Sequence, residues 1–274
     1  MTGHVLIFYH SASGNTQWVA EKLAASLPGC GIEAEVRSIA SRPRTDDLAS
    51  YELIGFGCPV MGFRPSFAMT RFIQSLPPQA QKPAFLFTTY AGVLANTPWM
   101  LDGYLSDRGF AVLADQHFRG EVSWPIARAA GLIINRGLPN DTMLPSISRF
   151  AGTLAELSDR HKAGVRSRPA PFSRSRLNPF YYLSLLNSPA RLRMMMGKKS
   201  SNTTRCTMCG QCADLCAAGA ISLAPYPTFS NSCDGCWGCF NVCPNGAIST
   251  IVGTSGRYTS KCTSHVLTQI RADP

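Results

Sequence analysis

The chain has 274 residues, enough for two domains, and 45% of them are hydrophobic, so we expect a packed core and exclude wholesale disorder. No apolar run reaches the ~18 residues of a membrane-spanning helix. The first residues also lack the basic start and long apolar run of a signal peptide, so we expect a cytoplasmic protein. The formal net charge is +10, and the excess lies in residues 160–205, which contain Lys and Arg but no acidic residue.

Strand and helix patterns alternate over residues 1–162, which we expect to form the first domain. In chain order, the sequence predicts a strand at Val5–Tyr9, a helix at Thr16–Leu27, strands at Ile32–Arg37 and Leu53–Gly57, a helix at Ser66–Leu76, a strand at Ala84–Thr88, a helix at Thr97–Arg108, a strand at Phe110–Ala114 and a helix at Asp141–Lys162. The last helix has Asn140 or Asp141 as its N-cap. Strands that alternate with helices predict an α/β fold, here a doubly wound, five-stranded parallel sheet covered on both faces.

A run of small and polar residues separates the first strand from the first helix. It reads Ser11-Ala12-Ser13-Gly14-Asn15-Thr16. Hydroxyls and backbone N–H groups at a helix N-terminus form an anion site, so we interpret this run as a phosphate loop. It has neither the glycine pattern of dinucleotide folds nor the lysine of a P-loop, and a plain N-cap loop is the alternative.

Two apolar, glycine-containing loops follow the third and fourth strands, at 58–64 and 89–93. Ligands of open α/β sheets bind beyond the carboxyl ends of the strands. Phe63 and Tyr90 could therefore cover a planar ring between them, although packing is the commoner role of a loop aromatic. A phosphate loop beside two such loops indicates a mononucleotide site for flavin.

An enzyme would need a proton donor beside an open flavin face. The candidates near these loops are Cys58, Arg64, Tyr90, His117 and Arg119. Simpler roles are open for several of them: a packed thiol for Cys58, a solvated guanidinium for Arg64 and a surface imidazole for His117.

Residues 163–202 connect the two halves of the chain, and we expect them to form a partly helical strap across both domains. Apolar side chains at near-helical spacing would anchor it, namely Leu177, Phe180, Tyr181, Leu183, Leu186 and Leu192. The basic charge of this region either neutralises anionic cofactors on both sides or attracts nucleic acid, anionic lipid or an acidic partner.

Eight of the eleven cysteines form two runs with the same spacing, C-x2-C-x2-C-x3-C. The first run is Cys206, Cys209, Cys212 and Cys216, and the second is Cys233, Cys236, Cys239 and Cys243, followed by Pro244. In such runs three cysteines hold one [4Fe–4S] cluster and the fourth ligates the other cluster. The expected sets are Cys206, Cys209, Cys212 with Cys243, and Cys233, Cys236, Cys239 with Cys216. Structural zinc is the weaker alternative, because a third closely spaced cysteine is redundant for one tetrahedral ion.

These motifs together resemble a known family. Residues 1–162 resemble flavodoxin, and residues 203–255 resemble a bacterial two-cluster ferredoxin, a small α+β domain, before a tail at 256–274. The order resembles flavodoxin–ferredoxin fusion proteins of anaerobic metabolism. The resemblance implies FMN and two [4Fe–4S] clusters as cofactors. It implies that FMN is contacted by Ser11, Ala12, Ser13, Gly14, Asn15, Thr16, Pro59, Val60, Met61, Gly62, Thr89, Tyr90, Ala91 and Gly92.

The combination predicts electron transfer between FMN and the clusters. One hypothesis is an oxidoreductase that takes electrons from a ferredoxin-like or other low-potential donor and reduces a small organic substrate at the flavin. The alternative is an electron-transfer module that serves a separate enzyme. A non-redox alternative has structural clusters and a basic strap that binds nucleic acid, which we do not expect. A peripheral contact with a membrane is compatible with the strap.

Overall fold

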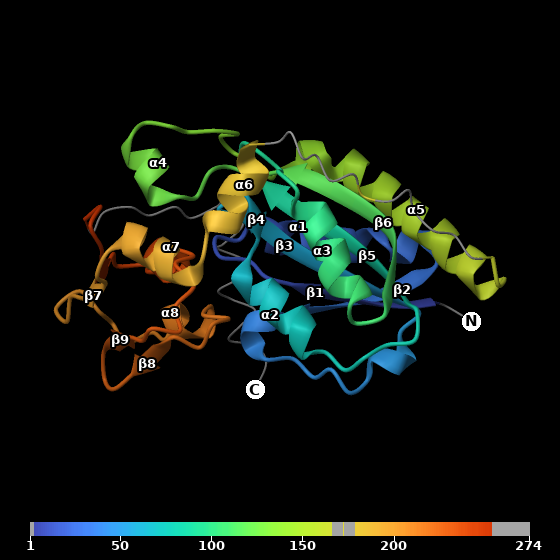
Figure 1. Cartoon of the computed structure of the whole chain (residues 1–274), viewed down its shortest axis with the longest axis horizontal. Coiled ribbons are helices and arrows are strands. Elements are labelled where there is room, and N and C mark those ends of the chain that lie inside the picture. Colours follow the sequence, from blue (N-terminus) through green and yellow to red (C-terminus); the bar gives the residue numbers. More distant parts are fainter. Residues whose placement is uncertain (1–2, 166–171, 173–178, 254–274) are drawn as a thin grey trace.

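The structure is a computed structural model that describes residues 3–165, 172 and 179–253 (Figure 1). Its centre is a sheet of five parallel strands, β1 (Gly3–Tyr9), β2 (Ile32–Ser38), β3 (Leu53–Met61), β5 (Lys82–Tyr90) and β6 (Phe110–Arg119). Their order across the sheet is β2-β1-β3-β5-β6, and the two-residue strand β4 (Arg64–Pro65) pairs antiparallel with β3. The predicted five-stranded parallel sheet is therefore confirmed.

Three strands run further than their apolar patterns indicate. β3 continues through residues 58–61, which we expected to be loop, because Val60 and Met61 pair with β4. β5 and β6 stay paired as far as Tyr90 and Arg119, beyond the predicted ends. The later part of β6 carries polar side chains because it is an edge strand, so its apolar pattern stops before its hydrogen bonding does.

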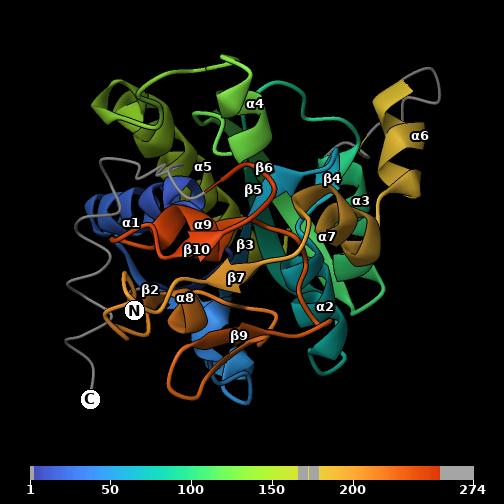
Figure 2. The same cartoon turned by 90° about the vertical axis from the view of Figure 1, so that its left-hand side faces the viewer.

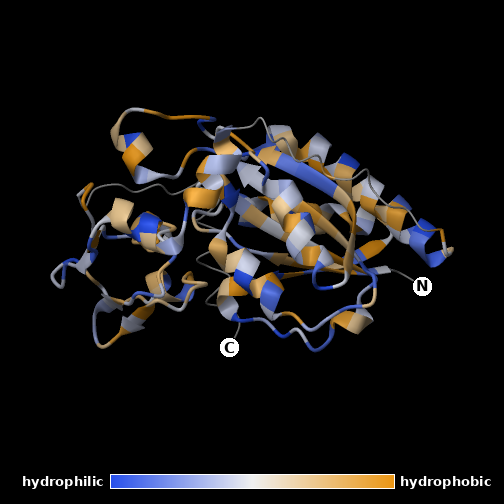
Figure 3. Ribbon diagram, in the orientation of Figure 1, coloured by the Kyte–Doolittle hydropathy of each residue, from blue (hydrophilic) through white to orange (hydrophobic). Residues whose placement is uncertain are grey.

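Two helices cover each face of the sheet, and the alternation of side chains along the strands explains this arrangement. Val5 and Ile7 point to the face covered by α1 (Asn15–Ser26) and α5 (Leu144–Lys162). Leu6 and Phe8 point to the face covered by α2 (Phe67–Ser75) and α3 (Thr97–Ser106). Figure 3 shows hydrophobic strands at the centre and mixed colours on the outer helix α5.

Two helical segments of the first domain begin with a side-chain cap. The side chain of Asn140 accepts a hydrogen bond from the Thr142 N–H at a 3₁₀ turn (Asp141–Met143) that leads into α5. Ser66 caps α2 in the same way. Three more 3₁₀ turns lie at Pro28–Cys30, Ile39–Ser41 and Leu48–Ser50, and a short helix that was not predicted, α4, spans Pro125–Ala129.

The cysteine-rich part is small and irregular. It contains β7 (Ser200–Ser201), α8 (Gln211–Asp214), β8 (Ile221–Leu223), β9 (Pro227–Phe229), α9 (Gly238–Val242) and β10 (Ile248–Ser249). β7 pairs with β10 and β8 with β9, both antiparallel. Figures 1 and 2 show this part in front of the carboxyl ends of the parallel strands, where ligands of such sheets bind.

The connector contains two helices, α6 (Pro179–Leu186) and α7 (Pro189–Met196). Tyr181 is buried, and the Phe180 ring lies 4.8 Å from that of Phe63. Leu183 and Leu186 are 44% and 56% exposed, so the prediction that they anchor the strap is wrong. The buried position is instead Ser184, one turn after Phe180, since only one narrow face of α6 meets the rest of the protein.

Leu177 lies outside the described residues. None of the described helices is long and apolar enough to cross a bilayer.

Candidate cofactor site

The phosphate-type loop lies where β1 ends and α1 begins. Ser11 is buried, and its Oγ accepts a hydrogen bond from the Gly14 N–H at 3.1 Å. Gly14 has φ 91°, a left-handed conformation that favours glycine, and no side chain caps the helix behind it. Backbone N–H groups of the first helical turn have no partner within their own helix, so this loop has the means to hold an anion.

Neighbouring segments hold the loop in place. The Thr16 and Thr89 hydroxyls are hydrogen-bonded at 2.7 Å, which joins the loop to the end of β5. The Asn15 side-chain amide donates to the Glu121 carbonyl at 3.1 Å, beyond the end of β6. Ala12 is buried, whereas Ser13 is partly accessible. All six predicted phosphate-loop residues therefore lie together at the carboxyl edge of the sheet.

The residues predicted to contact a flavin ring lie at the same edge. Pro59, Val60 and Met61 are half-buried at the end of β3, and Gly62 follows with φ 60°. Thr89 is buried at the end of β5, whereas Tyr90 and Ala91 are half-buried and Gly92 is exposed. The structure thus brings both predicted loops beside the phosphate loop, and helix α6 covers Phe63 from outside.

The five candidate proton donors do not form one cluster. Cys58 is completely buried in the core below α2 and α3, where burial raises the pKa of its thiol to about 12. It therefore cannot reach a substrate at an open flavin face, and the packed thiol is its role. His117 is held between the Thr88 hydroxyl at 2.9 Å and the Asp115 carboxylate at 2.8 Å.

The other three candidates have different surroundings, although Tyr90 and Arg119 are partners in the β5–β6 pairing and lie two residues beyond Thr88 and His117. Arg64 stacks over the Phe67 ring at 4.3 Å, and its guanidinium donates to the Asn187 carbonyl at 3.4 Å. Arg119 is exposed at the end of the edge strand β6, and Tyr90 ends the neighbouring strand.

The eight cysteines of the two runs surround two cavities, four around each. We call the first set the outer ring; it consists of Cys206, Cys209, Cys212 and Cys243. We call the second set the inner ring; it consists of Cys216, Cys233, Cys236 and Cys239. Each ring therefore takes three cysteines from one run and the last cysteine of the other run.

Backbone N–H groups approach several of these sulfurs. Cys243 Sγ accepts from the Ala247 N–H at 3.1 Å, and Cys216 Sγ accepts from the Ala220 N–H at 3.3 Å, the same offset in both runs. Among the residues that the structure describes, no three His, Cys, Asp or Glu side chains converge closely enough to hold one metal ion. The four cysteines of each ring therefore line a cavity and do not converge on the position of one metal ion.

The inner ring lies against the phosphate-type loop. A Cβ atom on Gly238 would lie 3.2 Å from the Ala12 carbonyl oxygen and 3.4 Å from Cys236 Sγ, so this glycine lets loop and ring approach. His10, immediately before the loop, lines the inner-ring cavity. Its ring bonds the Ser66 hydroxyl at 2.9 Å, and burial lowers the pKa of the imidazole to about 4.

Several residues at this junction were missed from the sequence. Arg71 of α2 forms a two-pronged ion pair with Asp234, both N–O distances being 2.7 Å, and Asp234 lies between two inner-ring cysteines. Asn241 of α9 donates to the Ser123 carbonyl at 3.0 Å. Only the position of His10 at the end of β1 offered a signal, because the other contacts join segments more than 100 residues apart.

Two basic residues of the connector region reach the inner ring. Lys199 Nζ lies 2.8 Å from Cys233 Sγ, and the Arg193 guanidinium donates to the Cys233 carbonyl at 2.7 Å. Their charge was visible in the sequence, but their position was not.

The fold around this edge can now be compared with known proteins. The family model described as "Flavodoxin domain" matches residues 6–105. The strand order of the sheet is the flavodoxin-like doubly wound order, with the first strand between the second and the third. The N-terminal domain is flavodoxin-like. No curated protein is significantly similar to the chain in sequence.

Solved structures similar to the flavodoxin-like domain include a flavodoxin from the domain Archaea, with 19% identity over 57% of this chain and 99% of that chain, and a TM-score of 0.44. The two-electron reduced flavodoxin of Megasphaera elsdenii has 21% identity over 56% and 98% of the two chains, and a TM-score of 0.42. Rubredoxin oxygen:oxidoreductase from Desulfovibrio gigas has 18% identity, covers 58% of this chain and 37% of its own, and has a TM-score of 0.44.

Proposed function

We propose that this protein transfers electrons between FMN, bound by the flavodoxin-like domain, and two [4Fe–4S] clusters, bound by the two cysteine rings. The observation that carries the proposal is the contact between the inner ring and the phosphate-type loop at Gly238 and Ala12. Electron tunnelling falls steeply with distance, so redox groups that exchange electrons need adjacent sites.

The residues at the carboxyl edge fit a flavin mononucleotide. The phosphate would be held by residues 11–16, where the left-handed Gly14 precedes the N-terminus of α1 and no side chain caps the helix. The ring would lie near residues 59–62 and 89–92, where both loops are partly accessible. When bound, FMN accepts electrons singly or in pairs, so it can connect one-electron centres to two-electron chemistry.

The cysteine rings fit iron–sulfur cubes by their donor set. Each ring offers four thiols, and the exchange of the fourth cysteine between the runs is the arrangement of two-cluster ferredoxins. Zn–S bonds of about 2.3 Å would draw four sulfurs to within roughly 4 Å of one another. A cube instead places one sulfur at each of four separate irons, and the N–H groups at Cys216 and Cys243 would stabilise the anionic thiolates.

The positions of the two rings favour one order of electron flow. The inner ring contacts the flavodoxin-like domain, whereas Met208, on the cavity of the outer ring, is 56% exposed. An external low-potential donor, such as a ferredoxin-like protein, would therefore deliver electrons at the outer ring, and they would pass through the inner ring to FMN. We assign residues 1–162 to the FMN domain, 163–202 to the strap, 203–255 to the cluster domain and 256–274 to a tail.

At the flavin, the leading candidate activity is the reduction of a small organic substrate, in a cytoplasmic and anaerobic setting. It is favoured by the accessible residues 90–92 of the ring loop. The alternative is a module that passes electrons to a separate enzyme. Rapid oxidation of the reduced flavin by one class of small molecule supports the reductase; oxidation only by a protein partner supports the module.

Cofactor content tests the proposal directly. Protein purified and reconstituted without oxygen is expected to contain one FMN and about eight irons with eight sulfides. Reduction is expected to give the EPR signals of reduced [4Fe–4S] clusters. Zinc in place of iron and sulfide, or failure to bind FMN, would overturn it.

Paired substitutions test the assignment of cysteines to clusters. Cys216 and Cys236 belong to the same ring, so Cys216→Ala/Cys236→Ala should retain about four irons, as Cys236→Ala alone does. The matched control, Cys212→Ala/Cys236→Ala, removes one cysteine from each ring and should lose both clusters. Loss of both clusters in the first pair would show that each run holds its own cluster.

A further inference from the structure

Among the described residues that line the cavity of the inner ring, one cation has no acidic partner on the cavity. Apart from cysteines, its ionisable lining residues are His10, Lys199 and Asp234. Burial keeps His10 neutral at pH 7 by lowering its pKa, and Asp234 is paired with Arg71 at 2.7 Å. On the cavity itself the remaining charge is that of Lys199, whose ammonium lies 2.8 Å from Cys233 Sγ, whereas the Arg193 guanidinium meets the same residue at its carbonyl oxygen.

The position of this ammonium is fixed by packing. Its Nζ lies 3.6 Å from Met196 Sδ and 5.3 Å from the centre of the Phe229 ring. Met196 is fully buried, and the backbone that follows Lys199 is held in the β7–β10 pair. The side chain is half-buried, so solvent screens its charge less than that of an exposed lysine.

From this geometry, and on the basis of the proposed function, we infer that Lys199 is a tuning residue that raises the reduction potential of the inner cluster. In that step one electron from a low-potential donor protein enters the cluster, no bond forms or breaks, and the site gains one negative charge. A fixed positive charge beside a ligand sulfur stabilises the reduced form more than the oxidised form.

Among the described residues that line the cavity of the outer ring, the charged side chain is Arg205. This side chain is exposed, so solvent and salt weaken its effect. Lys199 therefore makes the inner cluster the better acceptor of the two. Electrons that arrive at the outer ring are drawn toward the flavodoxin-like domain.

The test is an EPR-monitored redox titration of the full-length holoprotein, compared with Lys199→Met and the matched control Lys198→Met. Lys198 is the adjacent lysine and is exposed, so the control removes the same charge without removing a contact to sulfur. Lys199→Met should lower one of the two cluster potentials by at least the equivalent of a tenfold change in the reduced-to-oxidised ratio, ~59 mV for a one-electron couple. Lys198→Met should leave both cluster potentials unchanged, and Lys199→Arg should keep the potential of the inner cluster close to the wild-type value.

The outcomes separate this inference from the proposed function. Wild-type protein without iron and sulfide would overturn the proposed function itself. Two intact clusters whose potentials do not move in Lys199→Met, or move equally in Lys198→Met, would overturn the role of Lys199 alone. If Lys199→Met loses a cluster, Lys199→Gln is titrated instead; the same drop supports the inference and an unchanged potential refutes it.

Discussion

At residue 57 a glycine makes room for a phenylalanine on the neighbouring strand. A Cβ atom on Gly57 would lie 2.0 Å from Phe87 Cζ, and one on Gly55 would lie 2.3 Å from Phe85 Cζ. Both rings are completely buried, so neither can swing away. These glycines of β3 thus let two large side chains of β5 fill the core below α1 and α5.

Gly57→Ala is therefore expected to destabilise the protein by about 1–3 kcal/mol through overpacking. The measurement is the unfolding midpoint of the holoprotein in urea. Gly152→Ala in α5 is the matched control; its new Cβ meets nothing within 4 Å, so helix propensity should raise stability by about 0.5–1 kcal/mol. In a double variant, Phe87→Leu should relieve part of the loss, and additive losses would contradict the steric explanation.

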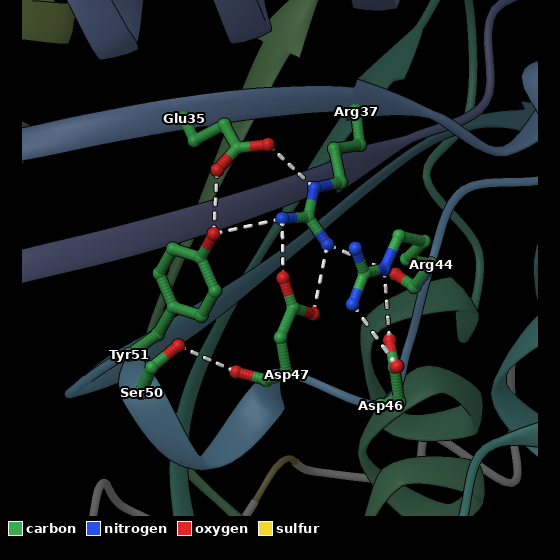
Figure 4. A network of polar contacts seen from close by, with 7 residues as sticks. All are labelled: Glu35, Arg37, Arg44, Asp46, Asp47, Ser50 and Tyr51. Atoms are coloured by element: carbon green, nitrogen blue, oxygen red, sulfur yellow. Dashed lines mark hydrogen bonds and ion pairs between the residues drawn. The ribbon is translucent and has the colours of Figure 1, made fainter.

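At the scale of the element, an edge strand is secured by a partly buried arginine (Figure 4). Arg37 of β2 bonds Asp47 at 2.6 and 2.9 Å, Glu35 at 2.6 Å and the Tyr51 hydroxyl at 2.8 Å. Its guanidinium holds the pKa of Glu35 and of Asp47 below their usual values. The network fastens the segment before β3 to the outermost strand of the sheet.

Arg37→Met should lower stability at pH 7 by about 1 kcal/mol, since the network is only partly buried. Both carboxyls have lower pKa values in the native than in the unfolded state. Their contribution is therefore complete above the unfolded values of about 4 and is lost as the pH falls through the lowered native values. The difference in urea midpoint between wild type and variant should shrink between pH 7 and pH 3.

Arg44→Met is the control for this series. Arg44 pairs with Asp46, but their side chains are 77% and 70% exposed, so its removal should change stability little at either pH. An equal loss in both variants, or a gap for Arg37→Met that widens in acid, would show that the network does not act as described.

Elements of the sheet were predictable to the extent that their patterns were apolar and local. The bounds of β1 were predicted closely because both faces of this strand are buried. The length of β6 was underestimated because its polar residues Asp115 and His117 lie on an edge strand. The faces of α6 could not be predicted, because the burial of Ser184 rather than Leu183 depends on tertiary contacts made by Phe180 and Tyr181.

At the scale of the whole molecule, the candidate site was likewise predictable only in those parts that are local in sequence. Its two halves were visible as motifs, because a phosphate-type loop and a cysteine run are each encoded within a few residues. Their junction was not visible, because His10 and Arg71 meet the inner-ring segment only through the packing of one domain against the other, and Lys199 meets it through the folding of the chain around β7.

That junction gives a prediction for the intact chain. Asp234 is 6% exposed and its partner Arg71 is 47% exposed, so Arg71→Met would leave a buried carboxylate unpaired beside the inner ring. Allowing for the exposure of Arg71, we expect a loss of about 1–3 kcal/mol. The loop carrying Cys233 and Cys236 should also loosen against the flavodoxin-like domain, which lengthens the path for the electron. Electron transfer from dithionite-reduced clusters to bound FMN should therefore be slower than in the wild type. The measurement is the stopped-flow absorbance of the flavin.

Cofactor content and a surface variant complete this test. Iron, sulfide and FMN are expected to stay at wild-type levels in Arg71→Met, so that the slower step reflects geometry rather than an empty site. Arg149→Met, which removes an equal charge from the exposed side of α5, should leave the rate unchanged. If Arg71→Met reduced its flavin as fast as the wild type while its unfolding midpoint fell, the ion pair would stabilise the interface without setting the distance between the redox sites.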